Sequence, residues 1–246
     1  MDINYIILSS SNKYYKCLFY NLKKCKNMQV VDWNHSNFNK LIFYNKILKT
    51  LQKNTFVILI DASDVICINN NINEMYNEFK SFNKDIVFGA ENGGHFVFEK
   101  HQNQNLLKYM NIFNLEPPTF SIKYGRRWLT NDNILNSGLI CGYSDKISNF
   151  FDMVINENKN NTSDQISIIN TIINNPILEK SISVDYKNIL FHNFSVFHED
   201  YLINENNCLK YKNKLIKPYF IHFPGITFAN QSKLFVHVLN KFNINI

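Results

Sequence analysis

Short apolar runs alternate with helical stretches along the first part of the chain. Apolar runs at residues 5–9, 28–32 and 55–60 predict buried strands. Between them, residues 13–26 and 39–52 place apolar side chains every three or four positions, which predicts helices. This strand–helix order is typical of βαβ units in a parallel sheet. The run TFVILI at 55–60 is the most apolar, so we expect it to be central in the sheet and covered on both faces.

The alternation continues to the end of the chain with less regularity. The expected helices are residues 72–82, 144–157, 163–173 and 231–242, and the expected strands are residues 85–90, 134–141, 182–185, 189–192 and 219–223. A hairpin is expected around Asn213, and residues 91–133 are expected to be less regular than the rest. Neither a repeat nor a linker composition interrupts the chain. We therefore expect one α/β domain over residues 1–246, with a Rossmann-like first half, a mixed second half and a mixed sheet flanked by helices.

Composition limits the possible environments and partners. The five cysteines are scattered, without a CxxC pair, which favours free thiols in a reducing compartment. The N-terminus lacks the basic and long apolar regions of a signal peptide, and no stretch approaches the length of a membrane span, so a cytoplasmic protein is expected. The net charge of +6 comes from lysines that are spread along the chain, so we expect no nucleic-acid partner.

Two carboxylates follow the most apolar strand directly. Asp61 and Asp64 enclose two small residues, Ala62 and Ser63. Ligands of open α/β sheets bind beyond the carboxyl ends of strands, and paired carboxylates suit a hard divalent cation such as one that bridges a nucleotide diphosphate. Spacing alone leaves a second interpretation equally open, in which Asp61 caps a turn and Asp64 is simply exposed.

Six segments of the chain match, in order and spacing, the motifs of one known family. They are DASDVI at 61–66, DIVFGAE at 85–91, LNSGLICGY at 135–143, SDQ at 163–165, the pair VD at 184–185 and FHN at 191–193, and FIH at 220–222 with Gly225. Together they resemble the glycosyltransferase domain of the procollagen lysyl hydroxylases and the related collagen glycosyltransferases. The resemblance runs from about residue 9 to residue 225. It implies a GT-A fold, with a nucleotide-binding half at 1–91 and a donor-sugar and acceptor half at 92–246.

The resemblance also implies an activity and a metal site. The expected reaction is transfer of a hexose from UDP-glucose or UDP-galactose to a hydroxyl group of a protein or glycan, with retention at the anomeric carbon. Asp61, Asp64 and His222 are the implied ligands of Mn²⁺ or Mg²⁺, and mixed Asp and His coordination suits Mn²⁺. A lone histidine beside Phe223 is more often a packing residue, so this alternative stays open for His222.

Other positions are expected to contact the UDP-sugar. Glu91 and Asp164 would be the catalytic carboxylates that face the sugar, although Asp164 could instead cap a helix. Lys40 could neutralise a phosphate or be a solvated helix lysine. The remaining binding positions implied are Ser10, Trp33, Ser63, Asn136, Ser137, Gly138, Gln165 and Gly225.

The chain departs from the family pattern at two positions, Ser63 and Pro224. Ser63 stands where the family usually has an aromatic residue that packs on the base, and Trp33 could take that role or belong to the core. Pro224 replaces a polar residue expected near the phosphates. Two related functions remain open: a glycogenin-like or galactosyltransferase-like enzyme, whose HF-x-G motif fits residues 222–225, and an inactive homologue that binds nucleotide sugars. A nucleic-acid binder ranks third.

Overall fold

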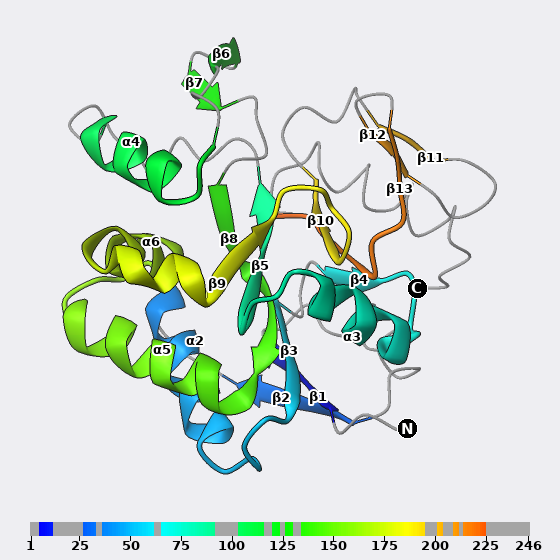
Figure 1. Cartoon of the computed structure of the whole chain (residues 1–246), viewed down its shortest axis with the longest axis vertical. Helices are drawn as coiled ribbons and strands as arrows, with labels where there is room; N and C mark the ends of the chain where they lie inside the picture. The colour runs from blue at the N-terminus through cyan, green and yellow to red at the C-terminus, as the bar shows by residue number, and fades with distance from the viewer. Residues whose placement is uncertain are drawn as a thin grey trace.

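A six-stranded sheet forms the centre of the protein (Figure 1). The computed structural model describes residues 5–11, 27–32, 36–61, 65–91, 103–115, 120–123, 126–129, 134–194, 201–203, 209–211 and 214–224. The strand order is β2-β1-β3-β8-β5-β9. The strands are β1 Tyr5–Ser11, β2 Met28–Asp32, β3 Phe56–Asp61, β5 Ile86–Glu91, β8 Ile134–Tyr143 and β9 Ile182–Asp185.

The direction of β8 makes the sheet mixed, as expected. β8 runs antiparallel to both of its neighbours, β3 and β5, whereas β1 pairs in parallel with β2 and β3, and β5 with β9. The carboxyl ends of β3 and β5 therefore lie at the same edge of the sheet as the beginning of β8. This edge collects Asp61, Glu91 and Asn136 from three separate strands.

Helices cover both faces of the sheet (Figure 1). The helices on one face are α2 Asn37–Leu48, α4 Asn103–Ile112, α5 Ser144–Glu157 and α6 Asp164–Asn174, and α3 Ile72–Ser81 lies on the other. Val57 and Leu59 of β3 belong to the first core, and Phe56, Ile58 and Ile60 to the second. Alternate residues of a strand point to opposite faces. The prediction that residues 55–60 are central and buried on both faces is therefore confirmed.

A small sheet packs on the same face as α3. It consists of β10 Phe191–Asn193, β14 Phe220–His222 and β4 Val65–Cys67, with β14 in the middle. β14 runs parallel to β10 and antiparallel to β4. This pairing brings the end of the chain's last described strand back to the segment that follows β3. The other elements are the hairpin β6 Phe120–Lys123 and β7 Arg126–Leu129, the meander β11 Tyr201–Ile203, β12 Leu209–Tyr211 and β13 Lys214–Ile216, and the 3₁₀ helix η1 Pro176–Lys180.

Most predicted elements are present, with shifts at their ends. α5, β2 and β9 have the predicted bounds, and the hairpin around Asn213 is present as β12 and β13. The less regular stretch 91–133 contains α4, β6 and β7 among its described residues, and β1 extends through Ser11, two residues beyond the predicted strand. The expected helices at 13–26 and 231–242 lie outside the described residues. Of the cysteines that the structure describes, Cys67 and Cys141 are buried free thiols, as expected.

A buried carboxylate organises the loop between β9 and β10. Asp185 is fully buried and accepts hydrogen bonds from the backbone N–H groups of Ile189, Leu190 and Phe191, at 2.9, 2.7 and 2.9 Å. Burial raises the pKa of Asp185 to about 6, and these backbone donors oppose the rise. The loop leads directly into β10, which carries Asn193.

Replacement of Asp185 by asparagine is expected to lower the free energy of unfolding by about 1–3 kcal/mol at neutral pH, because an amide nitrogen would face backbone donors. The native pKa lies above the ordinary value, so the native state holds the proton more tightly than the unfolded state. The wild type should therefore lose stability relative to Asp185→Asn as the pH rises from about 4 to about 6. Above about pH 6, the stability difference between the two proteins should stay constant. Urea denaturation at several pH values measures both effects. Asp152→Asn, a change at a half-exposed carboxylate on α5, is the control, and an equal loss there would contradict the prediction.

Candidate functional site

Polar side chains converge where β3 and β5 end. Lys40, Asn136, Asp164, Asn193 and His222 are each at most 4% exposed, which is unusual for polar residues without a shared role. They come from α2, β8, α6, β10 and β14, which are distant in sequence. Buried polar groups require partners, so the contacts among these side chains define the site.

Lys40 joins two carboxylates. Its Nζ lies 2.7 Å from Asp61 Oδ1 and 2.7 Å from Asp164 Oδ2. Burial alone would lower the pKa of Lys40, but the Asp164 and Asp61 carboxylates outweigh burial and raise it well above its usual range. Lys40 is therefore a charged group inside the site, and the alternative of a solvated helix lysine is wrong.

Asp164 is the first residue of α6 and faces the site. The cap of this helix is Ser163, whose hydroxyl accepts a hydrogen bond from the Ile166 N–H at 3.3 Å. Asp164 Oδ1 accepts from the Gln165 N–H at 2.8 Å, and Oδ2 pairs with Lys40. The alternative that Asp164 merely caps the helix is therefore wrong, because Ser163 fills that position.

Two amides hold the carboxylate of Glu91. Gln165 Nε2 donates to Oε1 at 2.7 Å, and Asn136 Nδ2 donates to Oε2 at 2.6 Å. Burial raises the pKa of Glu91, while these two hydrogen bonds oppose the rise. The carboxylate is thus fixed in orientation by side chains from β8 and α6, beside the Lys40 pair.

The partners of His222 determine its tautomer. His222 Nδ1 lies 2.7 Å from Asn193 Oδ1 and 3.1 Å from Asn136 Oδ1. Each amide is oriented by its own donor bond, since Asn193 Nδ2 donates to Ala90 O at 2.8 Å and Asn136 Nδ2 donates to Glu91. Both oxygens therefore accept, and Nδ1 carries the proton. A neutral imidazole protonated at Nδ1 has its lone pair on Nε2, the arrangement in which histidines bind metals.

Asn193 was not among the predicted site residues. It lies in the FHN segment that matched the family, but the match assigned it no role. Its contact with His222 depends on the parallel pairing of β10 and β14, in which these two residues are register partners. No local pattern in the sequence signals such a pairing.

Gly138 allows Asp61 and His222 to approach one another. A Cβ atom at this position would lie 2.5 Å from His222 Cε1 and 2.8 Å from Asp61 Oδ2, closer than real Cβ contacts allow. The pairing of β5 with β8 also shifts between Phe88 and Gly89, so that residues 137–139 have no partner on β5. Such bulges re-aim residues beside active sites. The carboxylate and the imidazole thus converge over the backbone of Gly138.

These two groups fit a divalent cation. Asp61 offers a carboxylate and His222 an imidazole of fixed tautomer, a combination that suits Mn²⁺. Asp64, the third predicted ligand, lies outside the described residues, but Val65 directly after it is the register partner of His222. Within the described residues, no three His, Cys, Asp or Glu side chains could together hold a metal ion. A complete site would require Asp64 or another group.

The remaining predicted positions are placed as follows. Ser10 is the register partner of Asp61 in β1, and Ser137 is buried in β8. Trp33, Ser63 and Gly225 lie outside the described residues.

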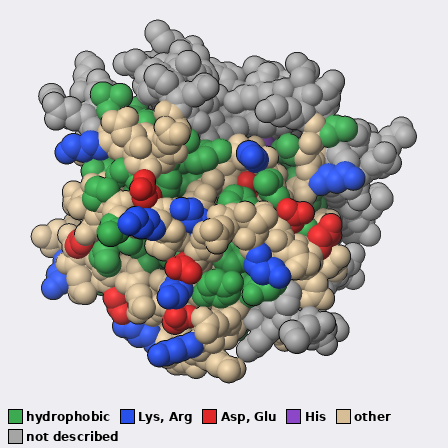
Figure 2. Space-filling model, in the orientation of Figure 1, with side chains coloured by type: hydrophobic (Ala, Val, Ile, Leu, Met, Phe, Trp, Pro, Cys, Tyr) green, Lys and Arg blue, Asp and Glu red, His purple; other side chains and the backbone are tan. Residues whose placement is uncertain are grey.

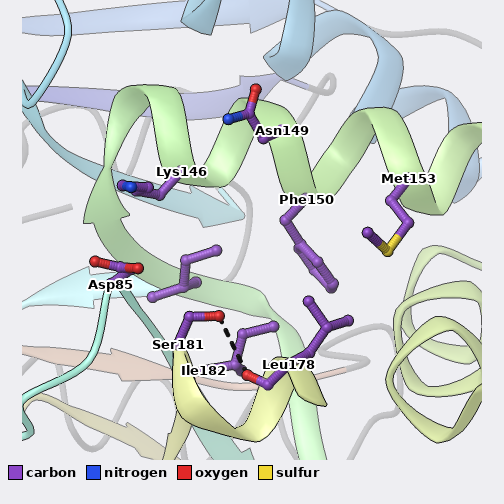
Figure 3. A pocket seen from close by; sticks show the side chains of 9 residues that line it. Asp85, Lys146, Asn149, Phe150, Met153, Leu178, Ser181 and Ile182 are labelled. Carbon is purple, nitrogen blue, oxygen red and sulfur yellow. Dashed lines mark hydrogen bonds between the residues drawn. The ribbon is translucent and has the colours of Figure 1, made fainter. Parts of the chain in front are cut away.

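A cavity of about 170 Å³ lies elsewhere (Figure 3). Phe150, Leu178 and Ile182 line it, with Asp85 and Lys146. Asp85 directly precedes β5, whereas Glu91 ends it. The cavity is therefore at the opposite edge of the sheet from the polar cluster and does not belong to the site.

The described residues carry charges of both signs. Basic and acidic side chains are interspersed over the described part of the face in Figure 2. Nucleic-acid binding instead favours a patch of one sign.

Among the described residues, no helix has the length and apolar character to cross a membrane.

Replacement of Gly138 by alanine is expected to weaken Mn²⁺-dependent UDP binding by about tenfold, because the added methyl group pushes His222 and Asp61 apart. Isothermal titration of UDP with Mn²⁺ and with EDTA measures this. Gly142→Ala is the control, since its Cβ would lie 2.3 Å from the backbone oxygen of Asp85, away from the site. The control should lower stability and leave the Mn²⁺ effect unchanged. Equal losses of Mn²⁺ dependence in both variants would contradict the prediction.

Comparisons with known proteins give a family and a fold. A family model described as the PLOD GT domain matches residues 31–243. No curated protein matches the sequence significantly. Among solved structures, mouse xyloside xylosyltransferase 1 has 11% identity and a TM-score of 0.50, with 92% of this chain and 99% of that chain covered. At this identity the likeness shows the fold alone, which is the GT-A fold.

Two further structures give lower TM-scores. A glycosyltransferase involved in the glycosylation of the major capsid of PBCV-1 has 12% identity and a TM-score of 0.49, with 95% of this chain and 98% of that chain covered. A Francisella tularensis 2-C-methyl-D-erythritol 4-phosphate cytidylyltransferase has 13% identity and a TM-score of 0.44, with 74% and 90% covered.

Proposed function

Because this chain belongs to the PLOD GT domain family, the glycosyltransferase domain of lysyl hydroxylase, we propose that it transfers a hexose from UDP-glucose or UDP-galactose to a hydroxyl group of a protein or glycan. The family makes the chain a glycosyltransferase, and it supports a nucleotide sugar as the donor. The proposal adds the donor, the acceptor group, retention at the anomeric carbon and dependence on a divalent cation. The observation that carries the dependence on a cation is the convergence of Asp61 and His222 over Gly138, and the donor, the acceptor group and retention are supported by the family.

The residues that would hold the cation are Asp61, Asp64 and His222. When bound, Mn²⁺ or Mg²⁺ would act as a Lewis acid that stabilises the negative charge on the departing diphosphate. The chain's own contribution is orientation. Asn136 and Asn193 fix the His222 ring, and Lys40 fixes the Asp61 carboxylate. Preorganised groups of this kind need no rearrangement during the reaction, which is a major source of catalysis.

The residues proposed to act on the sugar are Glu91 and Asp164. Both carboxylates are fixed, Glu91 by two amides and Asp164 by Lys40. They would orient hydroxyl groups of the donor and the acceptor, or stabilise positive charge that develops on the sugar ring. Correct orientation of two reactants removes much of the entropic cost of a bimolecular step.

The test is a UDP-release assay with UDP-glucose, UDP-galactose and their N-acetyl forms, each with Mn²⁺ and with EDTA. The expected result is release from one of the two hexose donors that requires the cation and increases with a hydroxyl acceptor. Equal UDP affinity with Mn²⁺ and with EDTA would overturn the metal dependence. Tight binding without turnover of any donor would instead support an inactive nucleotide-sugar-binding homologue.

A further inference from the structure

Lys40 and a divalent cation would compete for the same carboxylate. Its ammonium group is bonded to Asp61, the same carboxylate that is proposed to hold the cation. The side chains of Lys40 and Asp164 are only 3% and 5% exposed, so water screens this ion pair little, while that of Asp61 is 25% exposed. The protein without ligand therefore already neutralises Asp61 with a cation of its own.

Two effects would weaken the binding of a second cation to Asp61. It would share the charge of a carboxylate that already pairs with Lys40, and it would lie close to the positive ammonium group. Like charges a few ångströms apart at a partly buried site repel each other strongly enough to lower an affinity by about tenfold. Lys40 should thus weaken cation binding as long as its charge is directed at Asp61.

A nucleoside diphosphate changes this balance. Its phosphates bring negative charge that can pair with an ammonium group and with a divalent cation at once. Asp164 also remains as a partner for Lys40 at 2.7 Å when Asp61 turns to the cation. A bound diphosphate would therefore remove the penalty that Lys40 imposes on the cation.

We propose that Lys40 is a built-in counter-ion that makes cation binding at Asp61 depend on the nucleotide. This inference rests on the proposed function and adds an order to it: the cation binds weakly to the nucleotide-free protein and tightly together with the diphosphate. By thermodynamic linkage, the cation raises the affinity for the diphosphate by the same factor. Lys40 is thus a specificity-determining residue that discriminates against metal binding without a donor.

A purely structural ion pair makes a different prediction. If Lys40 only neutralises two buried carboxylates, its removal lowers the stability of the protein and does not increase its affinity for the cation. If Lys40 competes with the cation, its removal increases cation affinity in the absence of nucleotide. The two roles therefore differ in the sign of the effect on metal affinity.

The experiment measures Mn²⁺ binding to the nucleotide-free protein, from the electron paramagnetic resonance signal of free Mn²⁺. Lys40→Met should bind Mn²⁺ about tenfold more tightly than the wild type, and UDP should increase its Mn²⁺ affinity less. Lys40→Arg retains the charge and should behave as the wild type does. Lys49→Met is the matched control, because Lys49 is the C-cap residue of the same helix and pairs with Asp152 at 2.7 Å, outside the site. Unchanged or weaker Mn²⁺ binding by Lys40→Met would overturn the proposal.

A second variant tests the proposal if Lys40→Met does not fold. The double variant Lys40→Met with Asp164→Asn removes one positive and one negative charge, so that no uncompensated partner of Lys40 remains at Asp164 and the net charge is unchanged. It should still bind Mn²⁺ more tightly without nucleotide, since the competing ammonium group beside Asp61 is gone. Failure of the proposed function is seen separately, as UDP binding by the wild type that is equal with Mn²⁺ and EDTA. Metal-dependent UDP binding in the wild type without tighter Mn²⁺ binding in either Lys40 variant would overturn this inference alone.

Discussion

Replacement of His222 by alanine is expected to weaken Mn²⁺-dependent UDP binding by about 100-fold. The ring is held by Asn193 and Asn136 so that Nε2 carries the lone pair, and its loss would leave Asp61 without the nitrogen ligand beside it. Isothermal titration of UDP with Mn²⁺ and with EDTA measures the effect. The EDTA titration should change little, because the imidazole is assigned to the cation rather than to the nucleotide.

The same substitution should also destabilise the protein without ligand. His222 is 3% exposed, and its removal takes a donor from the buried Asn193 oxygen, while the Asn136 oxygen keeps the Gly138 N–H; the expected cost is about 1–3 kcal/mol. His192→Ala is the matched control. His192 is a fully buried histidine on the neighbouring strand, with Nδ1 2.9 Å from Asn188 Oδ1. Both variants should melt earlier, but only His222→Ala should lose the Mn²⁺ effect. A variant of His222 that is destabilised yet keeps its full Mn²⁺ dependence would show that the residue only packs.

The central strand and its acidic end could be predicted from the sequence because both depend on local pattern. The run at 55–60 is apolar enough to indicate burial on both faces, and Asp61 follows it directly. Glu91 stands in the same relation to the next predicted strand. Carboxyl ends of parallel strands share an edge, so these two positions follow from the strand directions.

The contacts that complete the site could not be predicted in this way. β4 has only three residues and is held by pairing with β14, which is far away in the sequence. Lys40 lies beside Leu41 in a helical pattern that is also consistent with a solvated lysine. Only the packing of α2 against the sheet and α6 brings Lys40 within 2.7 Å of Asp61 and Asp164. The resemblance located the positions, whereas their partners depend on the three-dimensional structure.

Replacement of Glu91 by glutamine is expected to leave UDP binding intact and to lower kcat by about 100-fold or more, a magnitude typical of removing a charged group that acts in the transition state. The substitution removes the negative charge and places an amide nitrogen opposite the Nε2 of Gln165 or the Nδ2 of Asn136, so one of the two hydrogen bonds is lost. Asp164→Asn should behave similarly, because it removes the charge that Lys40 holds in place. Steady-state kinetics with the preferred donor, together with UDP titrations, measure both properties.

The matched control for Glu91 is Glu157→Gln. Glu157 is a glutamate near the end of α5 whose carboxylate also accepts hydrogen bonds from an amide, that of Asn175 at 3.0 and 3.3 Å, away from the site. Its replacement should change neither kcat nor UDP affinity. A loss of kcat in Glu91→Gln with unchanged UDP affinity means that the carboxylate acts in the transition state rather than in binding the nucleotide. The opposite result, weaker UDP binding with normal turnover at saturating donor, would place Glu91 on the nucleotide and reverse the division between the metal-binding and sugar-binding sides of the site.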